Sequence, residues 1–259
     1  MTEFQKWRRA IQEGAFQNLN NRQLEAVFYV NGPLLILAGA GSGKTTVLIQ
    51  RIANMVRFGD AYYSDWEPEH TEEDVEHLKK VAQGMEKPNA HTWELCAVDP
   101  CPAWRILAIT FTNKAAGELK ERLSRTLGPE GEEVCAGTFH SFCARLLRQE
   151  GEALGYSNHF TIYDTDDSKR LLKECYKQLG IDEKVINIKE TMGEISRAKD
   201  SLCSPKEFEL ESGYDYRLKK IASLYALYQQ KLKEADAMDF DDLLYKTVEL
   251  FHSYGEILQ

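Results

Sequence analysis

The stretch PLLILAGAGSGKTT, residues 33–46, decides the fold of this 259-residue chain. Its apolar run, residues 34–37, predicts a buried strand, and the periodic apolar segment of residues 46–56 predicts a helix. The small and polar residues between them have the form of a phosphate-binding loop, with Ala38 in place of the usual first glycine. The sequence therefore predicts a strand, a phosphate loop and a helix in immediate succession.

The expected loop would bind the phosphates of a nucleotide through its backbone. Small residues let consecutive N–H groups point at an anion, and the N-terminus of the following helix adds partial positive charge. The side chains with catalytic roles would be Lys44, which reaches the terminal phosphates, and Thr45, whose hydroxyl ligates Mg²⁺. A plain glycine-rich turn is the alternative. The predicted phosphate-binding residues are Ala38, Gly39, Ala40, Gly41, Ser42, Gly43, Lys44, Thr45 and Thr46.

Gln23 lies just before the loop, on an expected helix that begins at Asn20 or Asn21. A glutamine amide can donate to one edge of adenine and accept from it at the same time. A glutamine on a helix is more often simply solvated, and the residues alone leave both interpretations open.

The composition suits one or two globular domains with a substantial core, since 43% of the residues are hydrophobic and 28% are charged. Six cysteines are scattered without the dense spacing of a disulfide scaffold, which favours a reducing cytoplasm. The first residues lack the apolar core of a signal peptide, and no apolar run is long enough to span a bilayer. No membrane partner is expected.

The net charge of −9 is concentrated in one segment. Residues 60–100 hold eleven acids and three bases, so they carry −8 and the rest of the chain carries −1. A nearly neutral remainder does not exclude a polyanionic ligand. We expect residues 60–103 to form an acidic insertion at the edge of the nucleotide domain. A capping pattern, Thr71-Glu72-Glu73-Asp74, predicts a helix there that ends near Gln83.

Zinc is one possible ligand of this insertion. The candidate ligands are His91, Cys96 and Cys101, with His70 as a fourth. Their spacing is unlike a pair of close zinc knuckles, so free thiols and a loop histidine are the alternative that the spacing favours.

Two further strand–helix units follow the insertion, with strands expected at residues 105–110 and 134–138. Each strand ends in a polar and aromatic cluster. In an open parallel sheet such ends line one edge, where hydroxyls, amides and helix N-termini hold phosphates and phenylalanine stacks on bases. The candidate nucleic-acid contacts are Phe111, Thr112, Asn113, Thr138, Phe139, His140 and Ser141. Helix caps with a core phenylalanine and a structural histidine are the alternative.

Helical patterns replace the strand–helix units from about residue 145. We expect residues 145–235 to form an inserted helical subdomain, in which a stripe of leucines and tyrosines along residues 214–235 supplies the core. Residues 1–144 and 236–259 would form a partial P-loop motor domain. A last amphipathic helix is expected to start in the segment MDFDDLL, residues 238–244.

Six stretches occur together and in a fixed order: LNNRQLEAV, AGAGSGKT, ILAITFTNKAAGELKER, AGTFHSFCARLLR, FTIYDTDD and MDFDDLL. In this combination the chain resembles the amino-terminal part of superfamily I DNA helicases of the UvrD/PcrA/Rep type, and the PcrA branch most of all. The resemblance covers roughly residues 19–58, 105–175 and 215–250. It leaves out the N-terminal extension and the acidic insertion.

The resemblance implies an α/β fold with a partial, RecA-like parallel sheet and an inserted all-helical subdomain. It implies ATP and Mg²⁺ as cofactors, and ATP hydrolysis coupled to 3′–5′ movement on single-stranded DNA and to duplex unwinding in repair or replication. The partners would be single-stranded DNA, the duplex junction and the remaining motor domains of a monomeric parent. By motif, Gln23 would read adenine, and the two polar and aromatic clusters would contact the strand.

The resemblance also implies acids that this sequence does not contain. The family's Mg²⁺-holding aspartate and water-orienting acid follow the MDFDDLL segment on a strand, and its arginines come later. The only Asp-Glu pair, Asp182-Glu183, follows Leu-Gly-Ile and predicts a helix start instead. We therefore expect a fragment of a longer motor that binds ATP weakly and does not hydrolyse it. A non-catalytic nucleotide- or DNA-binding module and a P-loop kinase are the alternatives.

Overall fold

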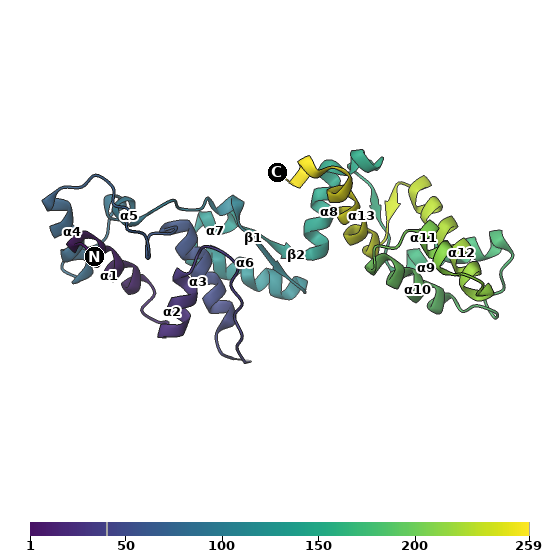
Figure 1. Cartoon of the computed structure of the whole chain (residues 1–259), viewed down its shortest axis with the longest axis horizontal. Helices are drawn as coiled ribbons and strands as arrows, with labels where there is room; N and C mark the ends of the chain where they lie inside the picture. The colour runs from purple at the N-terminus through teal and green to yellow at the C-terminus, as the bar shows by residue number, and fades with distance from the viewer. Residues whose placement is uncertain (40, 259) are drawn as a thin grey trace. The chain divides into compact units, whose positions relative to one another are not determined.

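The computed structural model describes residues 1–39 and 41–258, which form two compact units, Met1–Thr138 and Phe139–Gln259. Helices dominate both units, and each unit contains one short parallel pair of strands (Figure 1). The mixed α/β class is thus confirmed. The larger RecA-like sheet is not formed within the described residues, which build two-stranded sheets.

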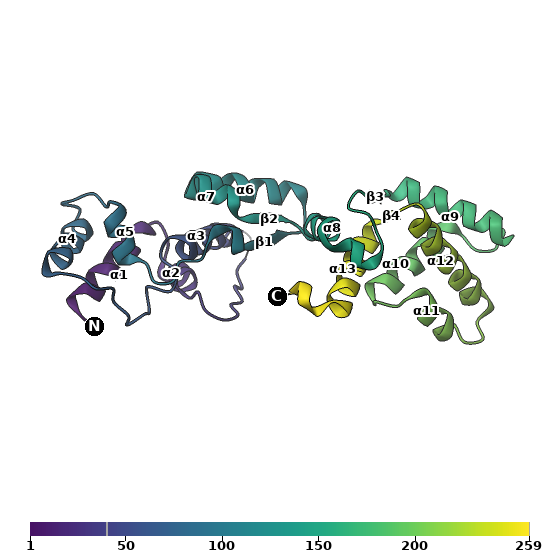
Figure 2. The same cartoon turned by 90° about the horizontal axis from the view of Figure 1, so that it is seen from above.

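The first unit contains seven of the described α-helices and one sheet. The helices are α1 (Glu3–Ala15), α2 (Asn21–Phe28), α3 (Lys44–Arg57), α4 (Glu72–Ala82), α5 (Ala90–Cys96), α6 (Asn113–Leu127) and α7 (Pro129–Glu133), with a 3-10 turn, η1 (Ala103–Arg105). Strands β1 (Leu107–Thr110) and β2 (Cys135–Thr138) pair in parallel, and α6 runs beside them (Figure 2). Both strands lie where the sequence predicts them.

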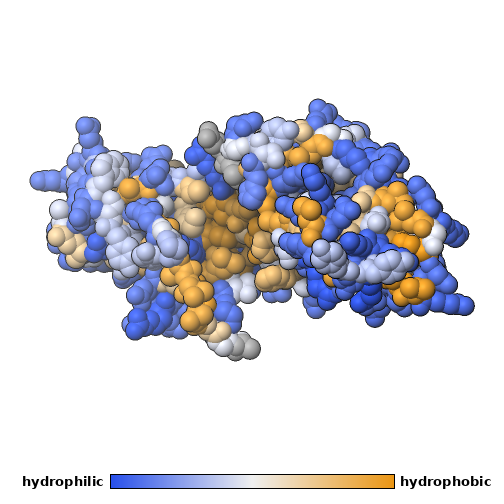
Figure 3. Space-filling model, turned by 45° about the vertical axis from the view of Figure 1, so that its right-hand side comes forward, coloured by the Kyte–Doolittle hydropathy of each residue, from blue (hydrophilic) through white to orange (hydrophobic). Residues whose placement is uncertain are grey.

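Residues 34–37 form no strand, so the predicted buried strand before the loop is wrong for this structure. Leu35 and Leu37 are 80% and 84% exposed. An apolar run becomes a buried strand only when neighbouring strands satisfy its backbone groups and cover its faces. Among the described residues β1 and β2 pair with each other, and residues 34–37 pair with neither. Hydrophobic surface, coloured orange, is also visible on the face drawn in Figure 3.

The acidic insertion packs against the N-terminal helix, because α1 contacts both α4 and α5. Arg8 on α1 is fully buried and donates to the carbonyls of Ser64 and Trp66. The base of the insertion is closed by a parallel bridge between Gly59 and Val98. The insertion and the N-terminal extension therefore share one core.

The second unit is mostly helical. It contains α8 (Phe139–Glu150), η2 (Gly151–Leu154), α9 (Thr165–Leu179), α10 (Ile188–Asp200), α11 (Pro205–Glu211), α12 (Tyr216–Glu234), α13 (Phe240–Ser253) and η3 (Gly255–Leu258). Strands β3 (Thr161–Ile162) and β4 (Ala237–Met238) pair in parallel. The predicted stripe on α12 is confirmed as core at Leu224, Tyr225, Tyr228 and Leu232, whereas Tyr214 is fully exposed.

The pair Asp182-Glu183 does not start a helix, and that prediction is wrong. Residues 183–185 form a turn, in which the Asp182 carboxylate accepts from the backbone N–H of Lys184 at 2.8 Å. An aspartate side chain that binds the backbone two residues on favours a turn over a helix. Helix α10 starts only at Ile188, after its cap Asn187.

All six cysteines are free thiols. No helix within residues 1–39 and 41–258 is both long and apolar enough to cross a membrane.

Candidate functional site

The predicted phosphate loop has glycines where a left-handed backbone is required. Gly41 has φ +77°, and Gly43, the N-cap of α3, has φ +84°. Residues other than glycine rarely adopt such angles, which explains glycine at both positions. The Ser42 hydroxyl donates a hydrogen bond of 2.7 Å to the Gly39 carbonyl, across the turn. Ala40, also predicted to bind phosphate, lies outside the described residues.

Lys44 folds back over this loop. Its Nζ donates to the carbonyl oxygens of Ala38 and Gly39 at 2.7 and 2.6 Å. An ammonium group carries three donors and prefers charged acceptors to neutral ones. The lysine is therefore held at the loop by weak partners that an anionic ligand can replace.

Gln23 reaches the same loop from α2. Its Oε1 accepts from the backbone N–H of Asn20 at 3.0 Å, and its Nε2 donates to the Ser42 carbonyl at 3.2 Å. The glutamine thus joins the capping box of α2 to the phosphate loop. A cavity of about 220 Å³ opens between them, lined in part by Asn20, Arg22, Gln23, Ile36, Ser42 and Lys44.

The two threonines after Lys44 differ in exposure. Thr45 is exposed on the first turn of α3, while the half-buried Thr46 accepts a hydrogen bond from Arg122 Nη2 at 2.9 Å. Mg²⁺ takes few protein ligands and draws most of its oxygens from water and substrate phosphates. The Thr45 hydroxyl, a hard oxygen donor beside the loop, fits that requirement.

The first predicted DNA-contact cluster lies at the carboxyl end of β1. Thr112 caps α6 and accepts from the backbone N–H of Ala115 at 3.2 Å, and Asn113 is the first residue of that helix. Phe111 is 91% exposed. A large apolar side chain with this exposure does not contribute to the core that the described residues form.

The second cluster begins at the carboxyl end of β2. The parallel register sets Thr138 opposite Thr110, so the two strand ends lie at the same edge, as the sequence predicts. Phe139 and Ser141 are exposed on the first turn of α8. The ring of His140 packs edge-on against Phe240, with ring centroids 5.9 Å apart. The sequence does not predict that aromatic pair, because the two residues are far apart along the chain.

A buried charge cluster was also missed from the sequence. Lys199, on α10, lies 2.7 Å from Asp239 and 2.9 Å from Asp242, and Tyr228 donates to Asp239 at 2.9 Å. Burial lowers the pKa of Lys199, but the two carboxylates outweigh it and the pKa is raised overall. Asp239 is the N-cap of α13 and is part of this cluster as well.

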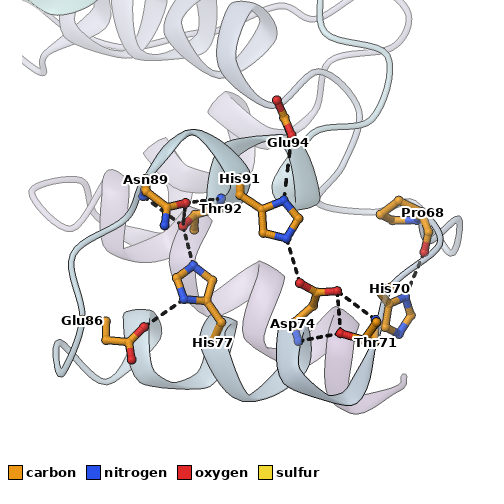
Figure 4. Close-up of polar contacts among 10 residues, drawn as sticks. All are labelled: Pro68, His70, Thr71, Asp74, His77, Glu86, Asn89, His91, Thr92 and Glu94. Carbon is orange, nitrogen blue, oxygen red and sulfur yellow. Dashed lines mark hydrogen bonds and ion pairs between the residues drawn. The ribbon is translucent and has the colours of Figure 1, made fainter.

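Two of the candidate zinc ligands, His70 and His91, make polar contacts within the acidic insertion (Figure 4). His91 contacts Asp74 at 2.7 Å, and His70 stacks on Phe4 with centroids 4.3 Å apart. Cys96 is fully buried, and burial raises the pKa of its thiol to about 12. Across residues 1–39 and 41–258 there is no group of three or more His, Cys, Asp or Glu side chains that could hold a metal ion.

Comparisons with known proteins identify a helicase family. A family profile described as the UvrD/REP helicase N-terminal domain matches residues 19–64 and 79–259. The match extends beyond the stretches that carry the resemblance in sequence, since it includes residues 79–103 and 176–214. The unmatched residues 65–78 lie inside the acidic insertion.

Individual relatives are similar along almost the whole chain. The ATP-dependent DNA helicase PcrA of Bacillus subtilis is 36% identical over 249 residues, which cover 96% of this chain and 28% of the relative. The PcrA of Staphylococcus aureus strain Mu50 is 36% identical over 93% of this chain and 28% of its own length. The PcrA of Leuconostoc citreum is 34% identical over 93% and 27%. The chain thus spans little more than a quarter of the relatives' length.

Proposed function

This chain belongs to the UvrD/REP helicase N-terminal domain family, and on that premise we propose that it is the nucleotide-binding part of an ATP-dependent DNA helicase. In the parent protein, hydrolysis of ATP would drive 3′–5′ movement along single-stranded DNA and unwinding of the duplex. By itself the chain would bind ATP weakly and not turn it over. The three relatives described above are ATP-dependent DNA helicases, which supports this assignment.

One observation carries the proposal: Lys44 and Gln23 meet at the same glycine loop. The ammonium group touches the carbonyls of Ala38 and Gly39, and the Gln23 amide touches the carbonyl of Ser42. Lys44 would exchange these carbonyls for the terminal phosphates, and Gln23 would read the adenine edge. Mg²⁺, when bound with the nucleotide, would neutralise phosphate charge, with Thr45 as its protein ligand.

The DNA strand would contact the two clusters at the ends of β1 and β2. Phe111 has the exposure that stacking on a base requires, and Thr112 and Asn113 lie at the N-terminus of α6, which favours phosphate. Thr138 and the first turn of α8 would supply the second contact. In this proposal both clusters contact backbone phosphates and stack on bases, so binding would have no sequence preference.

We further propose that residues 34–37 become a strand of a RecA-like sheet once other strands of the parent chain flank them. Their exposed leucines supply the apolar surface that such a sheet would bury. Residues 1–144 with 236–259 would then form the motor domain, and 145–235 its helical insertion. Six free thiols fit a reducing compartment, so we propose a cytoplasmic parent. We also propose that the parent is a monomer, as the family resemblance implies.

Nucleotide binding by the chain and ATPase activity of the parent test this proposal together. We expect Mg–ATP to bind the unmodified chain and Lys44→Ala to abolish binding. In the parent protein, single-stranded DNA should stimulate ATP hydrolysis, and duplexes with a 3′ tail should be unwound in preference to those with a 5′ tail.

Each other outcome points to a different function. ATP turnover that ignores single-stranded DNA but phosphorylates a small molecule would identify a P-loop kinase. Nucleotide or DNA binding without turnover in the parent would identify a non-catalytic binding module. Either result rejects the helicase assignment.

A further inference from the structure

Arg122 connects the helix behind the first DNA-contact cluster to the phosphate-loop helix. Its Nη2 donates to Thr46 Oγ1 at 2.9 Å, and its Nη1 lies 3.6 Å from Glu118, one turn earlier on α6. The Arg122 side chain is 30% exposed, and its guanidinium contacts both Thr46 and Glu118. Thr46 itself lies on the first turn of α3, two residues after Lys44.

The direction of this hydrogen bond decides what the Thr46 hydroxyl can do. A threonine hydroxyl has one proton to donate and two lone pairs to accept with, whereas a guanidinium can only donate. With Arg122 bound to a lone pair, the proton of Thr46 is directed to a different acceptor. A phosphate oxygen at the loop would be a strong acceptor of that kind.

We propose that Arg122 is a positioning residue of the nucleotide site, which orients the Thr46 hydroxyl to donate to a bound phosphate. This inference rests on the proposed function and deepens it, because it adds a residue outside the loop to the site. Arg122 acts through Thr46, because its guanidinium donates to that hydroxyl. The same helix begins with Asn113, so one rigid element carries both the DNA-contact cluster and the residue that orients Thr46.

A purely structural brace is the competing explanation, and the chain offers a matched control for it. Arg57, at the end of α3, donates to the Thr126 carbonyl on α6 at 2.6 Å. That bond joins the same two helices but involves no hydroxyl of the phosphate loop. Arg57→Gln therefore removes a brace between the helices and leaves the orientation of Thr46 intact.

A double-mutant cycle on Mg–ATP binding to this chain, measured by calorimetry, tests the proposal. We expect Arg122→Gln and Thr46→Val each to weaken binding about tenfold, the order of one charge-assisted hydrogen bond. The double variant should bind about as weakly as Thr46→Val alone, because Arg122 then has no hydroxyl to orient. Thr46→Ser, which keeps the hydroxyl, should bind within about twofold of the unmodified chain, and Arg57→Gln should bind unchanged.

Three outcomes would overturn the proposal in distinguishable ways. Unchanged binding in Arg122→Gln would reject the role of Arg122 alone. If Arg122→Gln weakens Mg–ATP binding equally in the unmodified chain and in Thr46→Val, Arg122 does not act through Thr46. The same conclusion follows if Arg57→Gln weakens binding as much as Arg122→Gln does. Absence of Mg–ATP binding by the unmodified chain would reject the nucleotide site itself, and the role of Arg122 with it.

Discussion

Lys199 donates a 2.7 Å hydrogen bond to Asp239, and its side chain is only 1% exposed. The two residues are 40 positions apart in sequence and join α10 to the N-cap of α13. Burying a charge costs several kcal/mol unless a partner and further hydrogen bonds compensate for it. Here Asp242 and Tyr228 complete the compensation. The MDFDDLL segment is thereby fixed to the helical unit.

Replacing Lys199 by Met should therefore leave two buried carboxylates without their counter-ion. We expect the free energy of unfolding to fall by about 3–5 kcal/mol, measured by urea denaturation. The matched control is Arg170→Met, which removes an exposed ion pair with Asp167 and should cost no more than about 0.5 kcal/mol. Equal losses in the two variants would show that the buried cluster adds no stability.

The close approach at the base of the acidic insertion can be tested at Gly59, which has φ +60°. A Cβ at this position would lie 2.1 Å from the Val98 carbonyl oxygen and 2.5 Å from that of Asp99. Gly59→Ala should therefore lower the unfolding free energy by about 3 kcal/mol or more, because backbone strain and a backbone clash add.

Gly84→Ala separates the two contributions. Gly84 has φ +74°, but nothing lies within 4 Å of its added Cβ. This variant should cost only the strain, about 1–2 kcal/mol. Thermal unfolding of the three proteins gives the comparison. If Gly59→Ala is no worse than Gly84→Ala, the insertion does not close against Gly59 as described.

The ion pair between His91 and Asp74 should be visible in a titration. The hydrogen bond from His91, followed by those from Thr71, lowers the pKa of Asp74 to about 2, and the same contact raises the pKa of His91. The Asp74 carboxylate contributes its full stabilisation above its unfolded pKa of about 4. This contribution is lost as the pH falls through the folded pKa of about 2. The His91 imidazolium contributes its full stabilisation below its unfolded pKa of about 6.5. This contribution is lost as the pH rises through the raised pKa of the folded state.

Asp74→Asn should therefore lower the pKa of His91, followed by NMR of the imidazole C2 proton. Glu94, 3.8 Å from the other ring nitrogen, provides the control. Glu94→Gln should lower the pKa of His91 less than Asp74→Asn does, because the Asp74 hydrogen bond is the larger cause. If the pKa of His91 is the same in Asp74→Asn as in the unmodified chain, the two residues are not paired.

Local capping signals in the sequence predicted the starts of α2 and α4. Asn20, one of the two residues expected to cap α2, and Thr71, expected to cap α4, are the N-caps of those helices. A short polar side chain before a periodic apolar segment can bind the free N–H groups of the first turn, and this needs no distant partner. The capping box of α2 also brought Gln23 to the phosphate loop.

Features that depend on distant partners were not predicted. Arg8 is buried against carbonyls that lie 56 and 58 residues away in the sequence. The pairing of Lys199 with Asp239 and the contact of Arg122 with Thr46 are equally invisible to helical periodicity. The strand prediction for residues 34–37 was wrong for the same reason. Apolar character indicates that a segment tends to be buried, but it does not identify what covers the segment.

The exposed leucines before the phosphate loop allow a test of the proposed sheet. Leu35 is 80% exposed, so Leu35→Ser should change the unfolding free energy of this chain by less than about 0.5 kcal/mol. The control is Leu123→Ala at a fully buried position on α6, which should cost about 2–5 kcal/mol.

The same two substitutions in the longer parent protein distinguish a strand from a loop. If neighbouring strands cover residues 34–37 there, Leu35→Ser removes a buried apolar side chain and should cost about 2–3 kcal/mol. Leu123→Ala should cost the same in both lengths of chain, because its surroundings are already complete. Urea denaturation of both variants in each length of chain, compared with the unmodified protein of the same length, supplies the free energies. A Leu35→Ser variant that remains neutral in the parent protein would show that this segment stays at the surface, and the proposed RecA-like sheet would have to form without it.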